Sequence, residues 1–465
     1  MDNVESTDDH IRDFAKDESG SMTLFTLFMV IMMVMVGGIG VDLMHAELDR
    51  VHRQQALDRA LLAAADLDQT LEPEEVIRDY FKKSGLDGQA SNIKVTTSST
   101  NRVVSAESLA QVPTSFMAAL GNPDLASYAT GSASEVVPNV EISLVLDISG
   151  SMRYSDRMTE LRPAARNFID SVIDDVSSKY TSVNLIPYAG QTNVGPFMFN
   201  RLNGQRYAQP PLDPSLGGDE NGLYPNVSSC LELNSSDFGH SGLPLGASYD
   251  QTPHFMNWTI ASDVMDWGWC PQDQSSIVYA SNNKTDLKDL VTNMRMHDGT
   301  GTAYAMKYAL ALLDPTSQPH FAAMAGAGLM PSQFANRPAQ WNSPQTTKYI
   351  ILMTDGQITE QKRPVDALAE ENPTVELQNR DKSDNTQVSS SSTNVSRFYQ
   401  SCDLAKSASR NVTVYTIAFE APAAAVEQMQ KCASSASHFY NVDSSEINDV
   451  FQAIARQVRQ LRLTN

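Results

Sequence analysis

The longest apolar run in the chain lies near its N-terminus. Leu24 to Val41 covers 18 residues without a charged side chain, and Thr26 is the only polar residue in it. This length meets the lower limit for crossing the hydrocarbon core of a membrane. A buried core helix or a cleaved signal peptide would give a similar run, but the preceding residues are acidic and the run is long for a signal peptide. We therefore expect one transmembrane helix at 24–41, preceded by a tail at 1–23.

Beyond the span, the apolar pattern predicts that the helix continues and then gives way to a small mixed unit. In residues 42–71, the apolar positions follow spacings of four, three and three, at Leu57, Leu61, Ala64 and Leu67. This is one face of a helix, which Pro73 ends. The sequence then alternates in strand fashion over 92–105 and looks helical over 108–120. We expect an α+β spacer at 72–138.

From residue 139 to 465, buried strands alternate with amphipathic helices, as a doubly wound parallel sheet requires. Five strands are expected, at Val140–Leu146, Ser182–Tyr188, Lys348–Met353, Asn411–Phe419 and His438–Val442. The first two are separated by a helical face made of Leu161, Ala165, Phe168, Val172 and Val176, and a final helix is expected at Glu446–Arg462. The fold class is therefore α/β.

Two stretches interrupt this alternation and are predicted to be insertions. The first, about 196–281, is rich in Gly, Pro, Asn and Ser and contains Trp258, Trp267 and Trp269. Its tryptophans form either a small satellite core or a contact surface, and the core is favoured because an insertion needs something to bury. The second, about 371–394, is polar and is expected to be a mobile loop.

Composition narrows the class of protein. The chain has 465 residues and a formal net charge of −21, so a nucleic-acid backbone is excluded as its main partner. A mean hydropathy of −0.30 excludes a protein with many membrane spans. The eight histidines are scattered, and no HExxH, GxSxG or Walker-type motif is present, so we do not expect an enzyme.

All four cysteines lie far beyond the apolar run, and none has the CxxC spacing of a metal site. Two disulfides in an oxidising compartment explain them best, with four free thiols in a reducing cytoplasm as the alternative. Of the three possible pairings we favour Cys230 with Cys270 and Cys402 with Cys432, because each pair brackets a compact segment. Positive charges flanking the span do not decide its orientation, but disulfides would place residues 42–465 outside the cytoplasm and residues 1–23 inside it.

Oxygen donors gather where the predicted strands end. Asp147, Ser149 and Ser151 follow the first strand, Asp355 follows the strand at 348–353, and Thr300 precedes a predicted helix. In an open α/β sheet, ligands bind outside the carboxyl ends of the strands. Carboxylates and hydroxyls are hard donors that select Mg²⁺, Mn²⁺ or Ca²⁺. Taken alone, Asp-x-Ser-x-Ser is most often an ordinary helix-capping turn, but three loops carrying donors in this order indicate a metal site.

Asp147-x-Ser149-x-Ser151, then a threonine, then Thr354-Asp355-Gly356 resembles the metal-ion-dependent adhesion site of von Willebrand factor A domains. The resemblance implies that Ser149, Ser151 and Thr300 contact the metal through hydroxyls, with Asp147 and Asp355 in support. Thr302 is an alternative to Thr300, which is preferred because Gly299-Thr300 followed by Ala305-Met306 fits the family spacing better. Mg²⁺ is the expected cofactor, with Ca²⁺ or Mn²⁺ as alternatives.

Over nearly its full length, the chain is similar to TadG-like proteins of the tight-adherence (Flp) pilus system. The similarity rests on the Glu18-Ser19-Gly20-Ser21 lead-in, the apolar span, the alanine-rich outer helix and an A domain with late cysteines. Smaller pseudopilins of that system carry a glutamate five residues after the cleavage glycine, where this chain has Phe25. The chain is therefore expected to stay anchored.

The resemblance implies a single-pass protein of the bacterial inner membrane, with its C-terminal domain in the periplasm or exposed at the cell surface. Its expected function is cation-dependent binding of a pilus or envelope protein that presents a carboxylate, in pilus assembly, anchoring or adhesion. The alternative is a structural envelope protein whose metal site is vestigial. Neither the partner nor the oligomeric state follows from the sequence.

Overall fold

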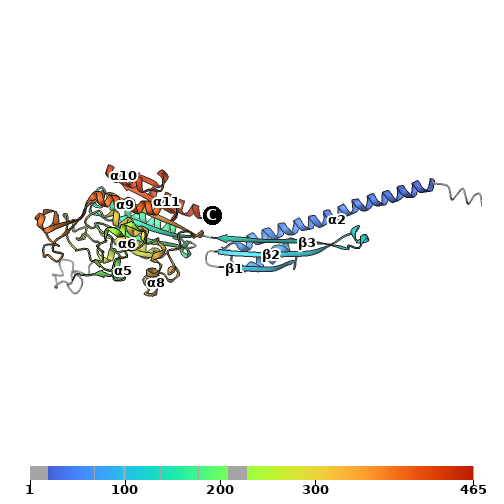
Figure 1. Cartoon of the computed structure of the whole chain (residues 1–465), viewed down its shortest axis with the longest axis horizontal. Helices are drawn as coiled ribbons and strands as arrows, with labels where there is room; N and C mark the ends of the chain where they lie inside the picture. Colours follow the sequence, from blue (N-terminus) through green and yellow to red (C-terminus); the bar gives the residue numbers. More distant parts are fainter. Residues whose placement is uncertain are drawn as a thin grey trace, which may run out of the picture. The chain divides into compact units, whose positions relative to one another are not determined.

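A computed structural model gives the architecture of the chain (Figure 1). It describes residues 19–67, 69–97, 101–136, 138–175, 177–207 and 228–463. The predicted tail lies outside the described residues up to residue 18, as do Val176 and the part of the first insertion at 208–227. The chain divides into two compact units, at residues 1–136 and 137–465, and each is described by itself.

The first unit is built around one long helix. Helix α2 (Ser19–Ala65) has 47 residues and contains both the predicted span and most of its predicted continuation. Among the described residues, it is the one helix long and apolar enough to cross a membrane. Its large apolar side chains are exposed over the span, whereas Leu57, Leu61 and Ala64 are buried further along, so the predicted helical face is confirmed for these three residues. Leu67, the fourth residue of that face, lies beyond the end of α2, which is shorter than the sequence predicts.

A three-stranded antiparallel sheet packs against the C-terminal half of α2 (Figure 1). Its strands, in the order β1-β2-β3, are β1 (Ala90–Thr97), β2 (Asn101–Pro113) and β3 (Asp124–Val136). Helix α3 begins at Pro73 and ends at Lys83. The helix predicted over 108–120 is wrong: this segment is the second half of β2 followed by a single turn at Met117–Leu120. The buried positions of β2 carry small residues, whereas the larger Leu109 is exposed. The spacing of the large apolar residues therefore suggests a helix where the chain forms a strand.

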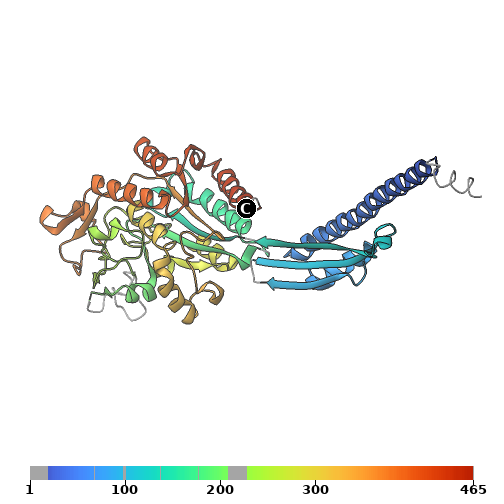
Figure 2. The same cartoon turned by 45° about the vertical axis from the view of Figure 1, so that its right-hand side comes forward.

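The second unit contains a six-stranded sheet in the order β13-β12-β9-β4-β5-β8. In Figure 2 this sheet lies among the helices of the unit. Five parallel strands correspond to those predicted: β4 (Asn139–Asp147), β5 (Thr181–Tyr188), β9 (Thr346–Thr354), β12 (Val412–Phe419) and β13 (Phe439–Val442). The edge strand β8 (Val278–Ser281) is antiparallel and is not among the predicted strands, because it lies at the end of the stretch interpreted as an insertion.

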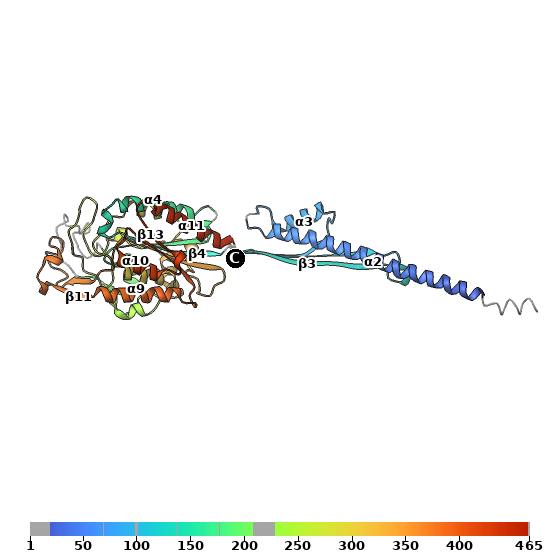
Figure 3. The same ribbon diagram turned by 90° about the horizontal axis from the view of Figure 1, so that it is seen from above.

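Helices cover both faces of this sheet, as a doubly wound fold requires. One face packs against α4 (Arg157–Val172), α6 (Lys284–Asn293) and α11 (Ile447–Leu463). The other packs against α7 (Thr302–Ala311), α9 (Ser391–Lys406), α10 (Ala423–Cys432) and the shorter α5 (Gly195–Arg201) and α8 (Gln318–Gly326). Alternate residues of β4 enter opposite cores, with Leu144 on one side and Val145 on the other. Seen from above, α4 and α11 lie on one side of the sheet and α9 lies on the other (Figure 3).

Both disulfides have the favoured pairing, Cys230 with Cys270 and Cys402 with Cys432. In the first insertion, Trp269 packs with Phe255 and with Leu377 in a small separate core. The second insertion is not the loop that the sequence predicts. It contains β11 (Asn385–Ser389), which pairs with β10 (Gln361–Pro364), and its serine run caps α9, because Ser390 Oγ accepts a hydrogen bond from Thr393 N at 3.2 Å.

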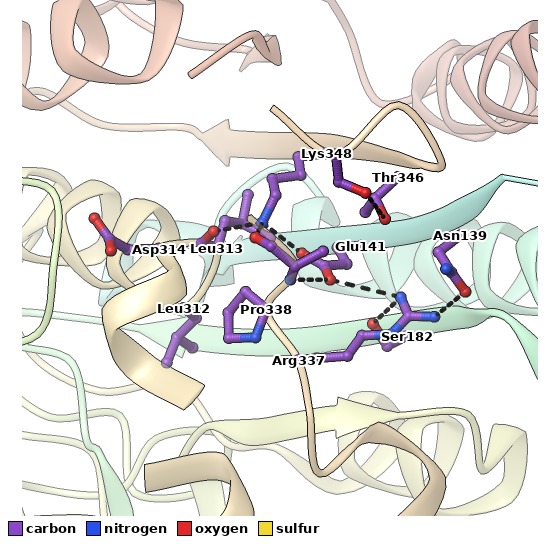
Figure 4. Close-up of polar contacts among 12 residues, drawn as sticks. Asn139, Glu141, Ser182, Leu312, Leu313, Asp314, Arg337, Pro338, Thr346 and Lys348 are labelled. Atoms are coloured by element: carbon purple, nitrogen blue, oxygen red, sulfur yellow. Dashed lines mark hydrogen bonds and ion pairs between the residues drawn. The ribbon is translucent and has the colours of Figure 1, made fainter. Parts of the chain in front are cut away.

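A buried ionic network lies at the amino ends of the central strands (Figure 4). Glu141 of β4 accepts hydrogen bonds from Lys348 Nζ of β9 and from the backbone N–H of Ala339, both at 2.8 Å. Lys348 Nζ also donates to the carbonyl of Leu313 at 2.7 Å, and Arg337 donates to the carbonyl of Tyr180 at 2.6 Å. The buried carboxylate of Glu141 is thus neutralised by neighbouring cations, and the network fixes the loop before β9 to the amino end of the sheet.

Candidate functional site

The candidate site lies at the opposite, carboxyl edge of the sheet, where three loops meet. Asp147 is the last residue of β4, and Asp355 follows the last residue of β9. The loop before α7 is tied to the loop after β4, because the backbone N–H of His297 donates to the carbonyl of Ile148 at 2.8 Å. Three segments that are far apart in the sequence are therefore held together by the sheet and by this backbone bond.

Side-chain oxygens converge between these loops. Ser149 Oγ and Ser151 Oγ are 3.0 Å apart, and Ser151 Oγ donates to Asp355 Oδ1 at 2.7 Å. Ser149 Oγ lies 3.4 Å from the same carboxylate oxygen. Two hydroxyls and one carboxylate thus form a compact group of hard donors, of the kind that Mg²⁺ and Ca²⁺ prefer.

Asp147 is fully buried beside this group. Its carboxylate accepts hydrogen bonds from the backbone N–H of Ser149 at 2.8 Å, from Thr354 Oγ1 at 2.7 Å and from Tyr188 OH at 3.2 Å. Burial and the charge of Asp355 raise the pKa of Asp147 to about 7. In the described part of the chain no lysine or arginine forms an ion pair with it, so its negative charge has no positive counterpart there.

Asp355 has a cationic neighbour. Arg157, the first residue of α4, donates to Asp355 Oδ2 at 2.7 Å and to Glu420 Oε2 at 3.0 Å. Burial raises the pKa of Asp355 in spite of the hydrogen bonds from Ser151 and Arg157. Among the described residues, the three carboxylates of Asp147, Asp355 and Glu420 are accompanied by a single guanidinium, which leaves two negative charges when all are ionised. A divalent cation would balance them.

The third loop contributes Thr300, which lines one cavity together with Ser149 and Ser151. A Cβ atom on Gly356 would lie 3.2 Å from Thr300 Oγ1 and 3.7 Å from Ser151 Oγ, so the glycine leaves the space between these hydroxyls open. Thr302 instead begins α7, is fully buried, and has its hydroxyl 3.4 Å from Tyr188 OH. The geometry thus puts Thr300 at the cavity, while the choice of metal ligands stays a prediction.

The donor set fits a hard cation, and its composition is unusual for a metal site. Within the described residues, no three His, Cys, Asp or Glu side chains gather where they would hold a metal. The predicted site supplies only two carboxylates, Asp147 and Asp355, and its other donors are hydroxyls. Such a site is recognised from its hydroxyls and its place at the sheet edge rather than from a cluster of acids and histidines.

The cavity in front of these donors is about 320 Å³ in volume, and part of its wall comes from the first insertion. Trp258, Thr259 and Met265 line it together with Arg153 and Tyr154. The insertion is held there by Asp298, which is buried and accepts hydrogen bonds from the backbone N–H groups of Asn257 at 2.6 Å and Trp258 at 2.8 Å. Burial raises the pKa of Asp298 to about 6.

Sequence reasoning misses several residues of the site. Tyr188 stands at the end of a predicted strand, so the rule that donors gather at strand ends could have found it. Arg157 has no such signal, because it reaches Asp355 only when α4 packs on the sheet. Trp258 and Asp298 also carry no specific signal, since their contact depends on how the insertion folds back.

Comparison with known proteins finds two family models, each of which matches part of the chain. The model described as "Putative Flp pilus-assembly TadE/G-like" matches residues 20–67, and that of the von Willebrand factor type A domain matches residues 268–453. The second match omits β4 and the Asp147 loop, although β4 is central in the sheet. No curated protein matches the chain.

Several solved structures are similar to the chain. They include the vWF domain of the type V pili tip protein Mfa5 from Porphyromonas gingivalis, with 13% identity and a TM-score of 0.36 over 70% of this chain and 96% of that chain. The pilus adhesin SpaC from Lactobacillus rhamnosus GG has 13% identity and a TM-score of 0.34 over 80% of this chain and 34% of that one. The match therefore spans about a third of SpaC.

The two family matches account for different parts of the molecule. The TadE/G-like match covers the apolar part of α2, and the A-domain match covers much of the doubly wound unit, whose predicted fold is confirmed. Together they indicate a pilus-associated protein of adhesion type, and its N-terminal apolar helix fits a single-pass membrane protein. The chain thus combines a TadE/G-like segment at residues 20–67 with a von Willebrand factor type A domain matched at residues 268–453.

Proposed function

We propose that the protein is a membrane-anchored, divalent-cation-dependent binding protein of a tight-adherence (Flp) pilus system. Von Willebrand factor A domains often bind a divalent metal at a site of this type. Here Asp147, Ser149, Ser151, Thr300 and Asp355 would hold the cation, with Mg²⁺ favoured. The bound cation would supply local positive charge to a strongly acidic chain, so that a carboxylate of a pilus or envelope protein can dock.

The observation that carries this proposal is the surplus of negative charge among convergent oxygen donors. Ser149, Ser151 and Asp355 are within hydrogen-bond reach of one another, and Asp147 is buried without a cationic partner among the described residues. Burying an uncompensated charge is costly, so proteins pair such charges or use them to coordinate metals. The donors also open onto a cavity, which a purely structural cluster does not need.

The same proposal includes the placement of the chain. Helix α2 would anchor the protein in the inner membrane, with residues 137–465 in the periplasm or exposed at the cell surface. Two disulfides in this region support the placement, because disulfides persist in oxidising compartments and are rare in the cytosol. The binding unit would then be on the side of the membrane where pilus components are found.

The test compares the wild type with Asp147→Ala, using the full chain in lipid nanodiscs and, in cells, pilus display and surface attachment. The wild type is expected to bind Mg²⁺ by calorimetry, and the variant is expected to lose metal binding and attachment together. Asp443→Asn, at an exposed carboxylate far from the donors in sequence, is the control. If the wild type binds Mg²⁺ and the variant does not, but both attach equally well, the result would instead support a structural envelope protein. If the wild type binds no metal, the cation site is refuted.

A further inference from the structure

The cavity beside the predicted metal site is larger than a carboxylate needs. Its volume of about 320 Å³ is within the range of small-ligand pockets, whereas one water occupies about 30 Å³ of liquid. Trp258, Tyr154 and Met265 give it apolar surface, and the donor hydroxyls line the same cavity. The cavity therefore has room for a carboxylate together with a neighbouring side chain.

Trp258 is both exposed and firmly positioned. It is 37% exposed, yet its backbone N–H is held by the carboxylate of Asp298 at 2.8 Å. Its ring lies 5.7 Å from that of Trp269, which is buried in the small core of the insertion. A large aromatic side chain that is pre-positioned at the rim of a pocket is typical of the residues that dominate binding interfaces.

Arg153 adds a cation to the same cavity. Its guanidinium donates to Met265 Sδ at 3.0 Å and to Tyr154 OH at 2.7 Å, and lies 4.9 Å from the Tyr154 ring. In the described part of the chain Arg153 takes part in no ion pair, in contrast to Arg157, which bridges two carboxylates. The cavity thus combines apolar surface with an arginine that has no acidic partner among the residues described.

We propose that this cavity is a specificity pocket for an acidic–aromatic pair in a partner protein. The inference rests on the proposed function: the carboxylate of the partner docks at the cation held by the donors, and an adjacent aromatic or large aliphatic side chain packs on Trp258. Arg153 attracts the acidic segment and disfavours a basic one. The first insertion, through Trp258, therefore determines which carboxylates the domain accepts, while the loops after β4 and β9 determine only that a carboxylate is required.

The experiment measures the affinity of the full chain in nanodiscs, with saturating Mg²⁺, for the probe peptides Gly-Ser-Asp-Phe-Gly-Ser and Gly-Ser-Phe-Asp-Gly-Ser. Control peptides replace Phe by Gly or Asp by Asn. We expect at least one of the two Phe peptides to bind about tenfold more tightly than the Gly peptide, and the Asn peptide to bind least. Arg153→Gln is expected to weaken binding of the acidic peptides about threefold.

Trp258→Ala should remove the preference for Phe while leaving Mg²⁺ affinity within about twofold of the wild type. Trp258→Phe should keep most of the preference for Phe. Trp267→Ala, in the same insertion but outside the cavity lining, should leave this preference unchanged. Three outcomes would overturn the specificity pocket but not the cation site: equal binding of the Phe and Gly peptides, binding of small carboxylates but of neither peptide, and binding of no peptide. Phe-peptide binding without Mg²⁺ would also overturn it, and absent Mg²⁺ binding would refute both proposals.

Discussion

The two ends of strand β4 each bury a carboxylate, and their surroundings differ in charge. At the amino end, Glu141 has Lys348 Nζ at 2.8 Å and Arg337 Nη1 at 3.8 Å. At the carboxyl end, Asp147 receives three hydrogen bonds from neutral groups, and among the described residues no cation pairs with it. The same strand therefore carries one end whose carboxylate is balanced by cations, here called the balanced end, and one end with surplus negative charge.

This difference separates structural from functional burial of charge. A buried ion pair does not add much to stability, but it leaves no charge for a ligand to neutralise. The surplus charge at the carboxyl end costs stability in the absence of a cation and favours binding of one. The higher pKa of Asp147 reflects that cost, because burial disfavours its ionised form. Substitutions at the two ends should therefore have different effects on stability and on cation binding.

The largest effect is expected at the balanced end. Lys348→Met would leave Glu141 buried without its closest cation, and breaking a buried pair costs about 3–5 kcal/mol. Denaturant unfolding followed by circular dichroism measures this loss. Lys362→Met is the matched control, because Lys362 pairs with Glu360 at the surface and such pairs contribute at most about 1 kcal/mol. Equal losses of stability from the two changes would show that the buried pair of Lys348 with Glu141 matters no more to the fold than a surface pair.

At the carboxyl end, we expect the stability of the protein to depend on Mg²⁺. A ligand bound only by the folded state stabilises it by about 2.7 kcal/mol at a free concentration one hundred times its Kd. Thermal unfolding with Mg²⁺ and with EDTA measures this gain.

The Asp147→Asn variant should gain nothing from Mg²⁺, and in EDTA it should be at least as stable as the wild type, because it buries no charge. Strong destabilisation of this variant in EDTA would mean that Asp147 is a structural residue like Glu141. That result would break the contrast between the two ends.

Lys307 is a third kind of buried charge and gives a pH dependence. It is fully buried, and its Nζ donates to the carbonyls of His240 and Gly242, at 2.7 and 2.6 Å. Burial lowers its pKa to about 8. Between this value and the unfolded value of about 10.4, the unfolded chain binds more protons, so stability rises with pH.

From pH 7.5 to 9.5, the wild type should gain on the order of 2 kcal/mol relative to Lys307→Met, measured by denaturant unfolding at each pH. Lys382→Met, at an exposed lysine, is the control. If the difference in unfolding free energy between the wild type and Lys307→Met does not change with pH, the hydrogen bonds to the two carbonyls compensate fully for the burial of Lys307. In that case burial of a lysine that forms no ion pair among the described residues would not be costly by itself.

The sequence predicts the carboxyl end of β4 much better than its amino end. Asp147, Ser149, Ser151 and Asp355 directly follow apolar strands, so the strand pattern alone is enough to place them at one sheet edge. The network around Glu141 has no such signal, because Arg337 comes from a loop and reaches the sheet only after α8 and that loop have packed.

The insertions and the spacer show the same limit. Apolar runs predict the five parallel strands, but β8 is a short edge strand that depends on pairing with β5, and β11 depends on pairing with β10. In β2 the inward residues are small, so the larger apolar residues suggest a helix instead. Trp258 belongs to a tryptophan cluster that is evident in the sequence, yet its position at the cavity results from the tertiary contact with Asp298.

The smallest effect is expected at Gly356, and it tests whether the hydroxyls at the carboxyl end act together. A Cβ atom there would lie 3.2 Å from Thr300 Oγ1, close enough to push the hydroxyl away by a few tenths of an ångström. Gly356→Ala should therefore weaken Mg²⁺ binding about tenfold, or about 1.4 kcal/mol, in calorimetry. Folding should change little, because the contacts are with side-chain ends. Gly326→Ala, where a Cβ meets nothing within 4 Å, is the control. If Gly356→Ala binds Mg²⁺ as the wild type does, Thr300 is not a ligand, and the surplus charge of the carboxylates alone would have to hold the cation.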